Sequence, residues 1–387
     1  MAAGHGAVWV HLNLYLRTIG LTESTIGWIA SASSVGVVLI SLPAAVWMDR
    51  FRAEHIFAMA AAGFGVSLLA MLFVARPAFL LAASLASGMF FTVHMVAITP
   101  FYMRNANAGH RTELLGVSSA FETFATVLTA AGVGALAKMG SAYFVSETTG
   151  LRLALGVSAI VSLGAVIPFA GIRSRPFASE RRDWRHYLYS SNMRLILKLS
   201  LPAFLVGCGA GLTIPFLNLY FRDRFHQDPA QIGLYFSVSQ ILTMLGFMAG
   251  PLLARRFTHV RAIVATELLS IPFFLLLALG DRLWLAVLAF WMRGALMNMN
   301  QPVSNAFAME VVPDADQAVT NSVRTLSWNL AWMLTTPLGG WLIEQRGYAA
   351  NMFVTIAFYL SAAALFWTFF RGYTIKTSAE RSLKAKA

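Results

Sequence analysis

The chain has 387 residues, of which 58% are hydrophobic and only 12% are charged. A soluble protein of this length needs far more charge to cover its surface, so the composition excludes an ordinary soluble enzyme and indicates lipid as the solvent. In lipid, only helix bundles and closed barrels satisfy the backbone hydrogen bonds. Barrel strands alternate apolar and polar residues, whereas residues 353–370 are apolar over about the length that a crossing helix needs. The sequence predicts a helical membrane protein.

The net charge of +12 is placed unevenly. With the N-terminus in the cytoplasm, most basic residues fall on the cytoplasmic side, among them those in residues 173–194 and 371–386. This distribution follows the positive-inside rule, so we interpret it as orientation and contact with anionic lipids, not as a nucleic-acid site. We expect a multi-pass protein of the cytoplasmic (inner) membrane with both termini in the cytoplasm. The lone Cys208 cannot form an internal disulfide, and we expect it to pack inertly.

Apolar runs between charged or Gly/Pro turns predict twelve helices, and their mostly short connections predict antiparallel neighbours. The predicted helices are residues 2–16, 24–46, 56–75, 78–101, 114–137, 151–171, 195–220, 231–253, 262–280, 283–308, 321–343 and 350–370.

The sequence contains an internal duplication. The first helix contains Leu-Asn-Leu-Tyr-Leu-Arg at residues 12–17, and the seventh contains Leu-Asn-Leu-Tyr-Phe-Arg at residues 217–222. An Ile-Gly pair follows each copy at nearly the same distance, and then a basic turn with Arg-Phe. Internal duplication with binding between the halves is common in secondary transporters. The first helix is shorter than its copy, so we expect a start upstream of Met1 or a helix that begins inside the bilayer.

These observations divide the chain into two six-helix halves. The expected units are residues 1–172, a cytoplasmic linker at 173–194, residues 195–371 and a cytoplasmic tail at 372–387. The linker is either a solvated tether or an amphipathic helix that lies on the membrane.

Twelve helices in two duplicated halves, joined by a long basic loop, resemble the major facilitator superfamily over the whole chain. The turn after the second helix keeps the acidic and first basic positions of that family's motif as Asp49 and Arg50, and the copy keeps Arg255 but has Ala254 in place of the acid. The resemblance implies two halves built from inverted three-helix repeats. It also implies that Asp49, Arg50 and Arg255 form a cytoplasmic gating turn. The alternative is a basic loop that only sets topology.

The fourth and fifth helices bear on subclass and coupling. The fourth reads Ser-Gly-Met at residues 87–89 without the Arg typical of drug antiporters, and the fifth lacks their Pro, so multidrug antiport is not favoured. Glu122 lies in the middle of the fifth helix on a stripe with Ser118, Thr126 and Thr129. A carboxyl in low dielectric is pushed toward its neutral form, so Glu122 is our candidate for proton coupling. The alternatives are an ion pair with Arg293 or Arg324, or a protonated hydrogen-bonding acid.

The tenth helix has the densest set of polar residues within an apolar run, and each such residue needs a partner or a function in lipid. By the family resemblance, the first, fourth, seventh and tenth helices line a central cavity. For the Asn and Gln residues of these helices, the alternative to substrate contact is hydrogen bonding between helices. For Arg293, the alternative is a structural ion pair with Glu122. In the eleventh helix, Trp328 and Trp332 indicate either stacking for a ring-bearing or cationic solute or packing between helices. The candidate cavity residues are Asn13, His94, Asn218, Arg293, Asn298, Asn300, Gln301 and Trp328.

The sequence shows no His-Glu-x-x-His, no Gly-x-Ser-x-Gly, no paired Cys and no acidic metal cluster, so we expect neither enzyme activity nor a metal or cofactor. We expect a monomeric secondary active transporter that moves a small solute by alternating access, with protons as the coupling ion. A uniporter of the same fold is the first alternative. A membrane receptor or enzyme that transports nothing is the second.

Overall fold

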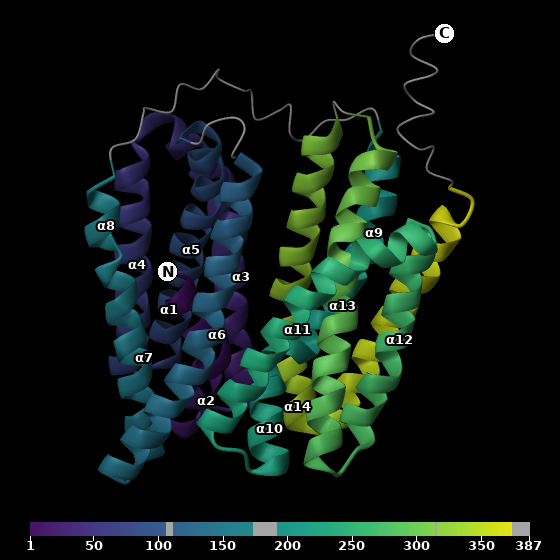
Figure 1. Ribbon diagram of the computed structural model, residues 1–387. Coiled ribbons are helices and arrows are strands. Elements are labelled where there is room, and N and C mark those ends of the chain that lie inside the picture. The colour runs from purple at the N-terminus through teal and green to yellow at the C-terminus, as the bar shows by residue number, and fades with distance from the viewer. Residues whose placement is uncertain (106–110, 173–191, 314–315, 374–387) are drawn as a thin grey trace.

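The computed structural model describes residues 1–105, 111–172, 192–313 and 316–373, and these ranges contain helices and no strand. Figure 1 shows two bundles side by side, the first in purple to blue and the second in green to yellow. Elements α1 to α8 form the first half, and α9 to α14 form the second.

The helix bounds follow the predicted spans closely. The first half contains α1 (Ala2–Ala7), the π-helical η1 (Val8–Leu12), α2 (Asn13–Thr18), α3 (Glu23–Arg50), α4 (Ala53–Phe73), α5 (Pro77–Asn105), α6 (Arg111–Phe144), α7 (Glu147–Gly164) and α8 (Val166–Ala170). The second half contains α9 (Met193–Thr213), η4 (Ile214–Phe216), α10 (Leu217–Phe225), α11 (Pro229–Arg256), α12 (His259–Leu279), α13 (Leu283–Val311) and α14 (Gln317–Phe370).

Twelve crossings are consistent with this list. Nine helical stretches of the described residues meet the length and hydropathy that a membrane span requires. The last of them, α14, contains two crossings, because Gly347 breaks it with φ 79° and ψ 174°, a backbone conformation that glycine adopts without a steric cost. The remaining two crossings are α13 and the run α1–η1–α2, in which a π-helical turn interrupts the α-helix. The predicted helical fold in two halves is confirmed.

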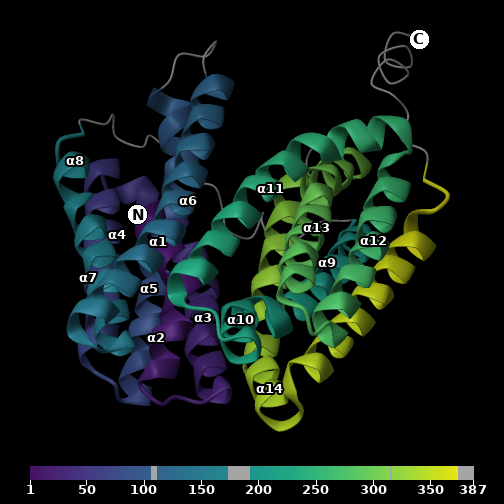
Figure 2. The same ribbon diagram turned by 60° about the horizontal axis from the view of Figure 1, so that its bottom comes forward.

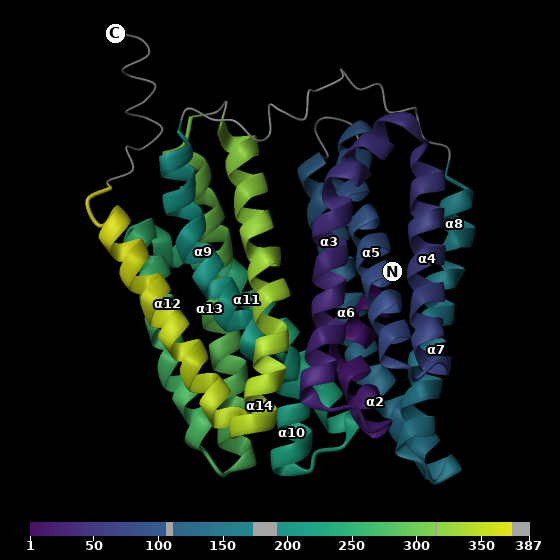
Figure 3. The same cartoon turned by 180° about the vertical axis from the view of Figure 1, so that it is seen from behind.

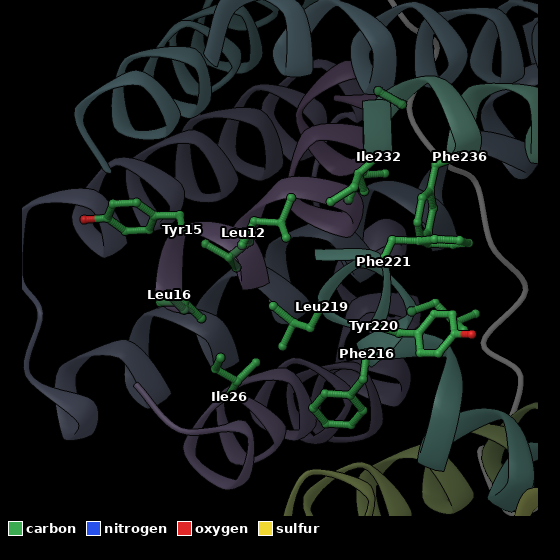
Figure 4. Packing of buried hydrophobic residues seen from close by; sticks show 14 of the residues in the cluster. Leu12, Tyr15, Leu16, Ile26, Phe216, Leu219, Tyr220, Phe221, Ile232 and Phe236 are labelled. Carbon is green, nitrogen blue, oxygen red and sulfur yellow. The ribbon is translucent and has the colours of Figure 1, made fainter. Parts of the chain in front are cut away.

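The duplicated segments occupy equivalent places in the two halves. Tyr15 in α2 donates to the carbonyl of Leu72 at 3.0 Å, and its counterpart Tyr220 in α10 donates to the carbonyl of Leu277 at 2.7 Å. Both copies contribute to one buried apolar cluster, and Figure 4 shows Leu16 of the first copy near Leu219 of the second. The repeated motif therefore builds the place where the halves join, toward one end of the bundles (Figure 1).

The halves contact each other through a seam in which α3 packs against α14 and α6 against α11, with η1, α2, η4 and α10 between them (Figure 2). One end of the seam carries Arg17, Glu147 and Asp228, and we call it the closed end. The other end carries Asn105, Arg111 and Arg256, and we call it the open end, since Figures 1 and 3 show the two bundles diverging toward it.

Glycines bring the helices of the seam into backbone contact near the closed end. A Cβ atom at Gly134 of α6 would lie 2.5 Å from the carbonyl oxygen of Pro229 at the start of α11. The counterpart Gly340 in α14 meets the carbonyl oxygen of Glu23 at the start of α3 in the same way. Close approach of this kind is what small residues provide in membrane proteins, where packing drives helix association.

We predict that Gly134→Val opens the closed end, because overpacking costs about 1–3 kcal/mol at a contact without room. Gly132→Val on the same helix is the matched control, since a Cβ atom there meets nothing within 4 Å. The measurement is maleimide labelling of Thr336→Cys, 1% exposed in the seam, in a Cys208→Ser background. Equal labelling rates in the two valine variants would contradict the prediction.

Candidate functional site

Two asparagines hold the halves together by reciprocal hydrogen bonds. Asn13 of the first half donates from Nδ2 to the carbonyl of Pro215 at 2.7 Å, and Asn218 of the second donates to the carbonyl of Val10 at 2.7 Å. Both side chains are buried. The structure thus places Asn13 and Asn218 in the seam itself, with their donors committed to the opposite half. The interhelical role left open for these amides is the one their geometry fits.

Two serines repeat this pattern farther along the seam. Ser31 of α3 donates to the carbonyl of Met333 in α14 at 2.6 Å. Ser237 of α11 donates to the carbonyl of Val127 in α6 at 2.8 Å. The two bonds are related by the internal duplication, as are those of the asparagines. Interhelical bonds in membranes contribute about 0.6 to 2 kcal/mol each, so the set is strong enough to hold the closed end and weak enough to break.

Ion pairs complete the closed end. Lys138 Nζ lies 2.8 Å from Asp228 Oδ2, and Arg222 lies 3.1 Å from Glu147 Oε2, each pair joining the two halves. Burial acts to raise the pKa of Asp228, but hydrogen bonds from Lys138 and from the backbone of Gln231 outweigh it, so this pKa lies below its ordinary value. Asp228 therefore stays charged at neutral pH and would lose the Lys138 pair only in acid.

A pocket of about 630 Å³ lies at the closed end beside these ion pairs. Three cations and three carboxylates line it, so it has no strong excess of either charge. Lys138, Arg222 and Arg17 are already paired with Asp228, Glu147 and Glu23 respectively. The pocket is therefore best understood as part of the closure and not as a ligand site.

Aromatic rings from both halves meet in the interior. Trp9 in η1 lies 5.6 Å from Trp332 in α14, measured between ring centroids, and Trp332 lies 6.2 Å from Trp328. His5 of α1 stacks between Trp9 and Phe91 of α5, with centroids 4.0 Å apart on the Phe91 side. Trp9 is 39% exposed although it contacts the opposite half, so part of its side chain is covered by neither half.

We call these five rings, His5, Trp9, Phe91, Trp328 and Trp332, the aromatic cluster. The indole Nε1 of Trp332 is buried and has no hydrogen-bond partner in the described part of the chain. Sequence reasoning singled out Trp328 and Trp332 but missed His5, Trp9 and Phe91. The π-helical turn around Trp9 is the feature that marks the first helix, because such turns occur often at functional sites, but no sequence signal showed it.

The polar residues of α13 point in several directions. Asn298 donates to the carbonyl of Gly294 at 2.9 Å and reaches Thr243 of α11 at 3.5 Å. Asn300 donates to Oε1 of the buried Glu267 on α12 at 3.0 Å. Gln301 is exposed. The predicted set therefore does not converge on one cavity, since Asn300 is used to satisfy a carboxyl inside the second half.

Arg293 departs from its expected place in the central cavity. Its side chain is 4% exposed, and its guanidinium carbon lies 5.0 Å from the ring centre of Phe274 on α12. It also interacts with Tyr359 in the second segment of α14. Arg293 and Asn300 are two helical turns apart, so both face α12 and turn away from the first half. In this structure Arg293 packs inside the second half, and its role in holding the substrate stays a prediction.

His94 also lies inside its own half. It is 7% exposed and packs against Phe57 and Phe169, with centroids 5.5 and 5.9 Å away. In this structure the ring of His94 is packed among aromatic rings of the first half, and its place in the cavity stays a prediction. His94 and Asn300 are related by the duplication, and each contacts an outer helix of its own half.

Glu122 is exposed on α6 and has no hydrogen bond from its side chain among the described residues. On the same stripe, Ser118 donates to Tyr102 at 2.8 Å, and Thr126 and Thr129 donate to carbonyls of their own helix. Arg324, one of the proposed partners, bonds to Ser304 instead at 2.9 Å.

The predicted gating turn consists of Asp49, Arg50 and Arg255. The side chains of these three residues are outside the part of the chain that the structure describes, so the gating turn stays a prediction.

The architecture defines a class: a polytopic helical membrane protein whose halves share a fold, close on each other at one end, and present aromatic side chains where they meet. The family follows from the sequence, since residues 1–191 and 199–386 match the family model of the Major Facilitator Superfamily. The chain belongs to this superfamily and is a membrane transporter. A comparison with curated proteins found no match.

Solved structures share the fold at low sequence identity. The nucleoside transporter NupG is 18% identical with a TM-score of 0.78, and the alignment covers 96% of each chain. A bacterial homologue of the lysosomal transporter Spinster, inward-facing and unoccupied, is 16% identical with a TM-score of 0.81 over 96% of this chain and 94% of that one. A D-xylose-proton symporter is 14% identical with a TM-score of 0.75 over 95% and 94%.

We predict that Arg293→Met and Glu122→Gln act independently on stability. The two residues belong to different halves and share no partner in the described structure, and such sites add within about 0.3–0.5 kcal/mol. The measurement is the melting temperature of both single variants and the double variant in detergent. Rescue of Arg293→Met by Glu122→Gln would instead revive the structural pair between them.

Proposed function

We propose that the protein is a secondary active transporter that carries a small ring-bearing solute across the cytoplasmic membrane by alternating access, with protons as the coupling ion. The observation that carries the proposal is the contact between Trp9 and Trp332, one ring from each half. A solute stacked on this pair touches both halves at once, so its binding can bias their relative position.

The chemistry of the aromatic cluster indicates what the solute presents. Indole rings favour contact with a flat or ring-shaped solute. The buried Nε1–H of Trp332 lacks an acceptor, and an unpaired buried donor costs about 1–3 kcal/mol. A solute with a carbonyl, hydroxyl or ring-nitrogen acceptor would remove this cost. Nucleosides and D-xylose, the cargo named for two proteins of the same fold, have such groups.

The distribution of basic residues indicates which side of the membrane the open end faces. Arg194, Lys198, Arg261 and Arg371 belong to helix ends at the open end of the second half. Positive residues favour the cytoplasmic side, so we assign the open end to the cytoplasm and the structure to an inward-facing state. On this assignment we expect the 173–194 linker and the C-terminal tail in the cytoplasm, whereas Met1 lies about midway along the first bundle (Figure 1) and not at its open end. We treat the protein as a monomer without cofactor or metal and without enzymatic activity.

The test of transport is counterflow in vesicles that contain the purified protein. Labelled nucleosides and pentoses, with an unrelated amino acid as a negative probe, are exchanged against unlabelled internal solute. Counterflow distinguishes a transporter from a receptor, since a receptor binds without flux. Dependence of net uptake on an imposed pH gradient then separates a proton-coupled transporter from a uniporter.

We predict that Trp332→Ala weakens binding of the transported solute by about 1–3 kcal/mol, or roughly 5- to 150-fold, because it removes the stacking ring and the indole donor. Trp332→Phe keeps a ring and should lose less. Trp284→Ala is the control, because Trp284 is 60% exposed at the start of α13 and outside the aromatic cluster. Isothermal titration of the three variants measures the effect, and equal affinities would remove the aromatic cluster from the binding site.

We predict that Glu122→Gln abolishes accumulation driven by a pH gradient and leaves solute affinity within about tenfold, roughly 1.4 kcal/mol. Gln keeps the size of the side chain but cannot exchange a proton. Glu267→Gln is the matched variant, because it changes a second carboxyl that lies within the membrane. Undiminished gradient-driven uptake in Glu122→Gln, together with its loss in Glu267→Gln, would move the coupling role to Glu267.

A further inference from the structure

His11 is fully buried in the seam, with an exposed fraction of 0%. It lies in η1 of the first half, and its Nε2 is 3.3 Å from the carbonyl oxygen of Pro229, the first residue of α11 in the second half. A carbonyl oxygen only accepts, so Nε2 carries the proton of the neutral ring. The other ring nitrogen, Nδ1, is buried without a partner in the described structure.

The space for this ring is made by glycines. A Cβ atom at Gly134 of α6 would lie 3.1 Å from His11 Nε2, and one at Gly233 of α11 would lie 3.2 Å from it. The imidazole is thus enclosed by two helices of the seam near the closed end. Water can reach Nδ1 only if the halves move apart.

The duplication supplies an internal comparison. Phe216 occupies the place of His11 in the second copy, and a Cβ atom at Gly27, the counterpart of Gly233, would lie 3.3 Å from the Phe216 ring. The fold therefore accepts a wholly apolar ring at this position, which packs against the same kind of glycine. Packing alone does not require a histidine in the first copy. What the histidine adds is a group that can take up a proton between pH 5 and 8.

Protonation of His11 is incompatible with the closed seam. The imidazolium ion would carry a charge and a second N–H, at Nδ1, into a space that offers only the Pro229 carbonyl. The N-terminal end of α11, which has a positive partial charge, lies against the ring and disfavours a cation further. Burial of an unpaired charge of this kind is strongly unfavourable, whereas the neutral ring needs one acceptor and has it.

Among the described residues, no carboxylate is paired with the His11 ring. The described titratable and charged groups on the elements packed against η1, together with Asp228 at the N-cap of α11, are His5, Tyr15, Arg17, Glu122, Lys138, Tyr143, Glu147, Arg152, Asp228, Tyr235 and Arg256. None of them has a hydrogen bond or ion pair with His11 in the described structure. The nearest carboxylate in sequence to the Pro229 contact, Asp228, is committed to Lys138 and to the start of α11.

We propose that His11 is a proton-binding site whose occupation opens the closed end, so that proton uptake drives the transporter toward its outward-open state. The inference rests on the proposed alternating access, and it adds His11 as a proton-binding residue besides Glu122. The sign is fixed: the open form binds the proton more tightly, so a fall in pH raises the open population, by at most about tenfold per pH unit for one group.

The test uses nitroxide labels at Val145→Cys and Arg282→Cys in a Cys208→Ser background. Both positions are exposed at the closed end, one in each half. Distance distributions are measured by double electron–electron resonance between pH 8 and pH 5 in lipid vesicles without solute. We expect the longer, open distance to gain population as the pH falls in the otherwise unaltered protein.

Two substitutions remove the proton site in different ways. His11→Phe introduces the ring that the second copy has at Phe216. His11→Gln keeps a hydrogen-bond donor for the Pro229 carbonyl. If one variant folds poorly, the other still tests the proposal. In both we expect less than twofold change of the open population between pH 8 and pH 5. His226→Gln is the matched control, since His226 is an exposed histidine of the closed-end pocket, and it should keep the full response.

The proposal is overturned if the open population does not rise in acid, or if the response persists in the folded His11 variants, or if His226→Gln alone abolishes it. The readout needs no solute. Failure of the proposed transport function would appear separately, as absence of counterflow in the unaltered protein at every pH.

Discussion

The structure depends on one constraint: in lipid, a polar group buried where the two halves join must find its partner within the protein. Asn13 and Asn218 meet this constraint reciprocally, each amide donating to a carbonyl of the opposite half at 2.7 Å. The carbonyls belong to Pro215 in η4 and Val10 in η1, next to interruptions of the α-helix where backbone acceptors are available. The aromatic cluster and the closed end are positioned by this joint.

The duplicated sequence separates structural positions from functional ones. Where both copies make the same bond, as Tyr15 and Tyr220 do, the residue holds the fold. Where the copies differ at the seam, the difference needs another explanation. His11 and Phe216 are the clearest case, because they fill equivalent spaces with different chemistry. Functional sites of a duplicated transporter can thus be sought at positions where the two copies have different residues.

The helices could be predicted from the sequence because apolar runs of about twenty residues have one stable outcome in lipid. The candidate site could be predicted only in part. Spacing shows that Arg293 and Asn300 share a face of α13, but it does not show that this face meets α12 instead of the first half. Trp9 gave no signal because its π-helical turn depends on tertiary packing. His11 was overlooked because a single histidine in an apolar run has many structural explanations.

The central claim is that the closed end must open during every transport cycle. Its most direct test is a reversible cross-link between Ser24→Cys of the first half and Glu344→Cys of the second, whose parent residues are joined by a 3.3 Å hydrogen bond, in a Cys208→Ser background. A short disulfide-forming cross-linker should stop counterflow, and reduction should restore it. Undiminished counterflow through fully cross-linked protein would contradict the account.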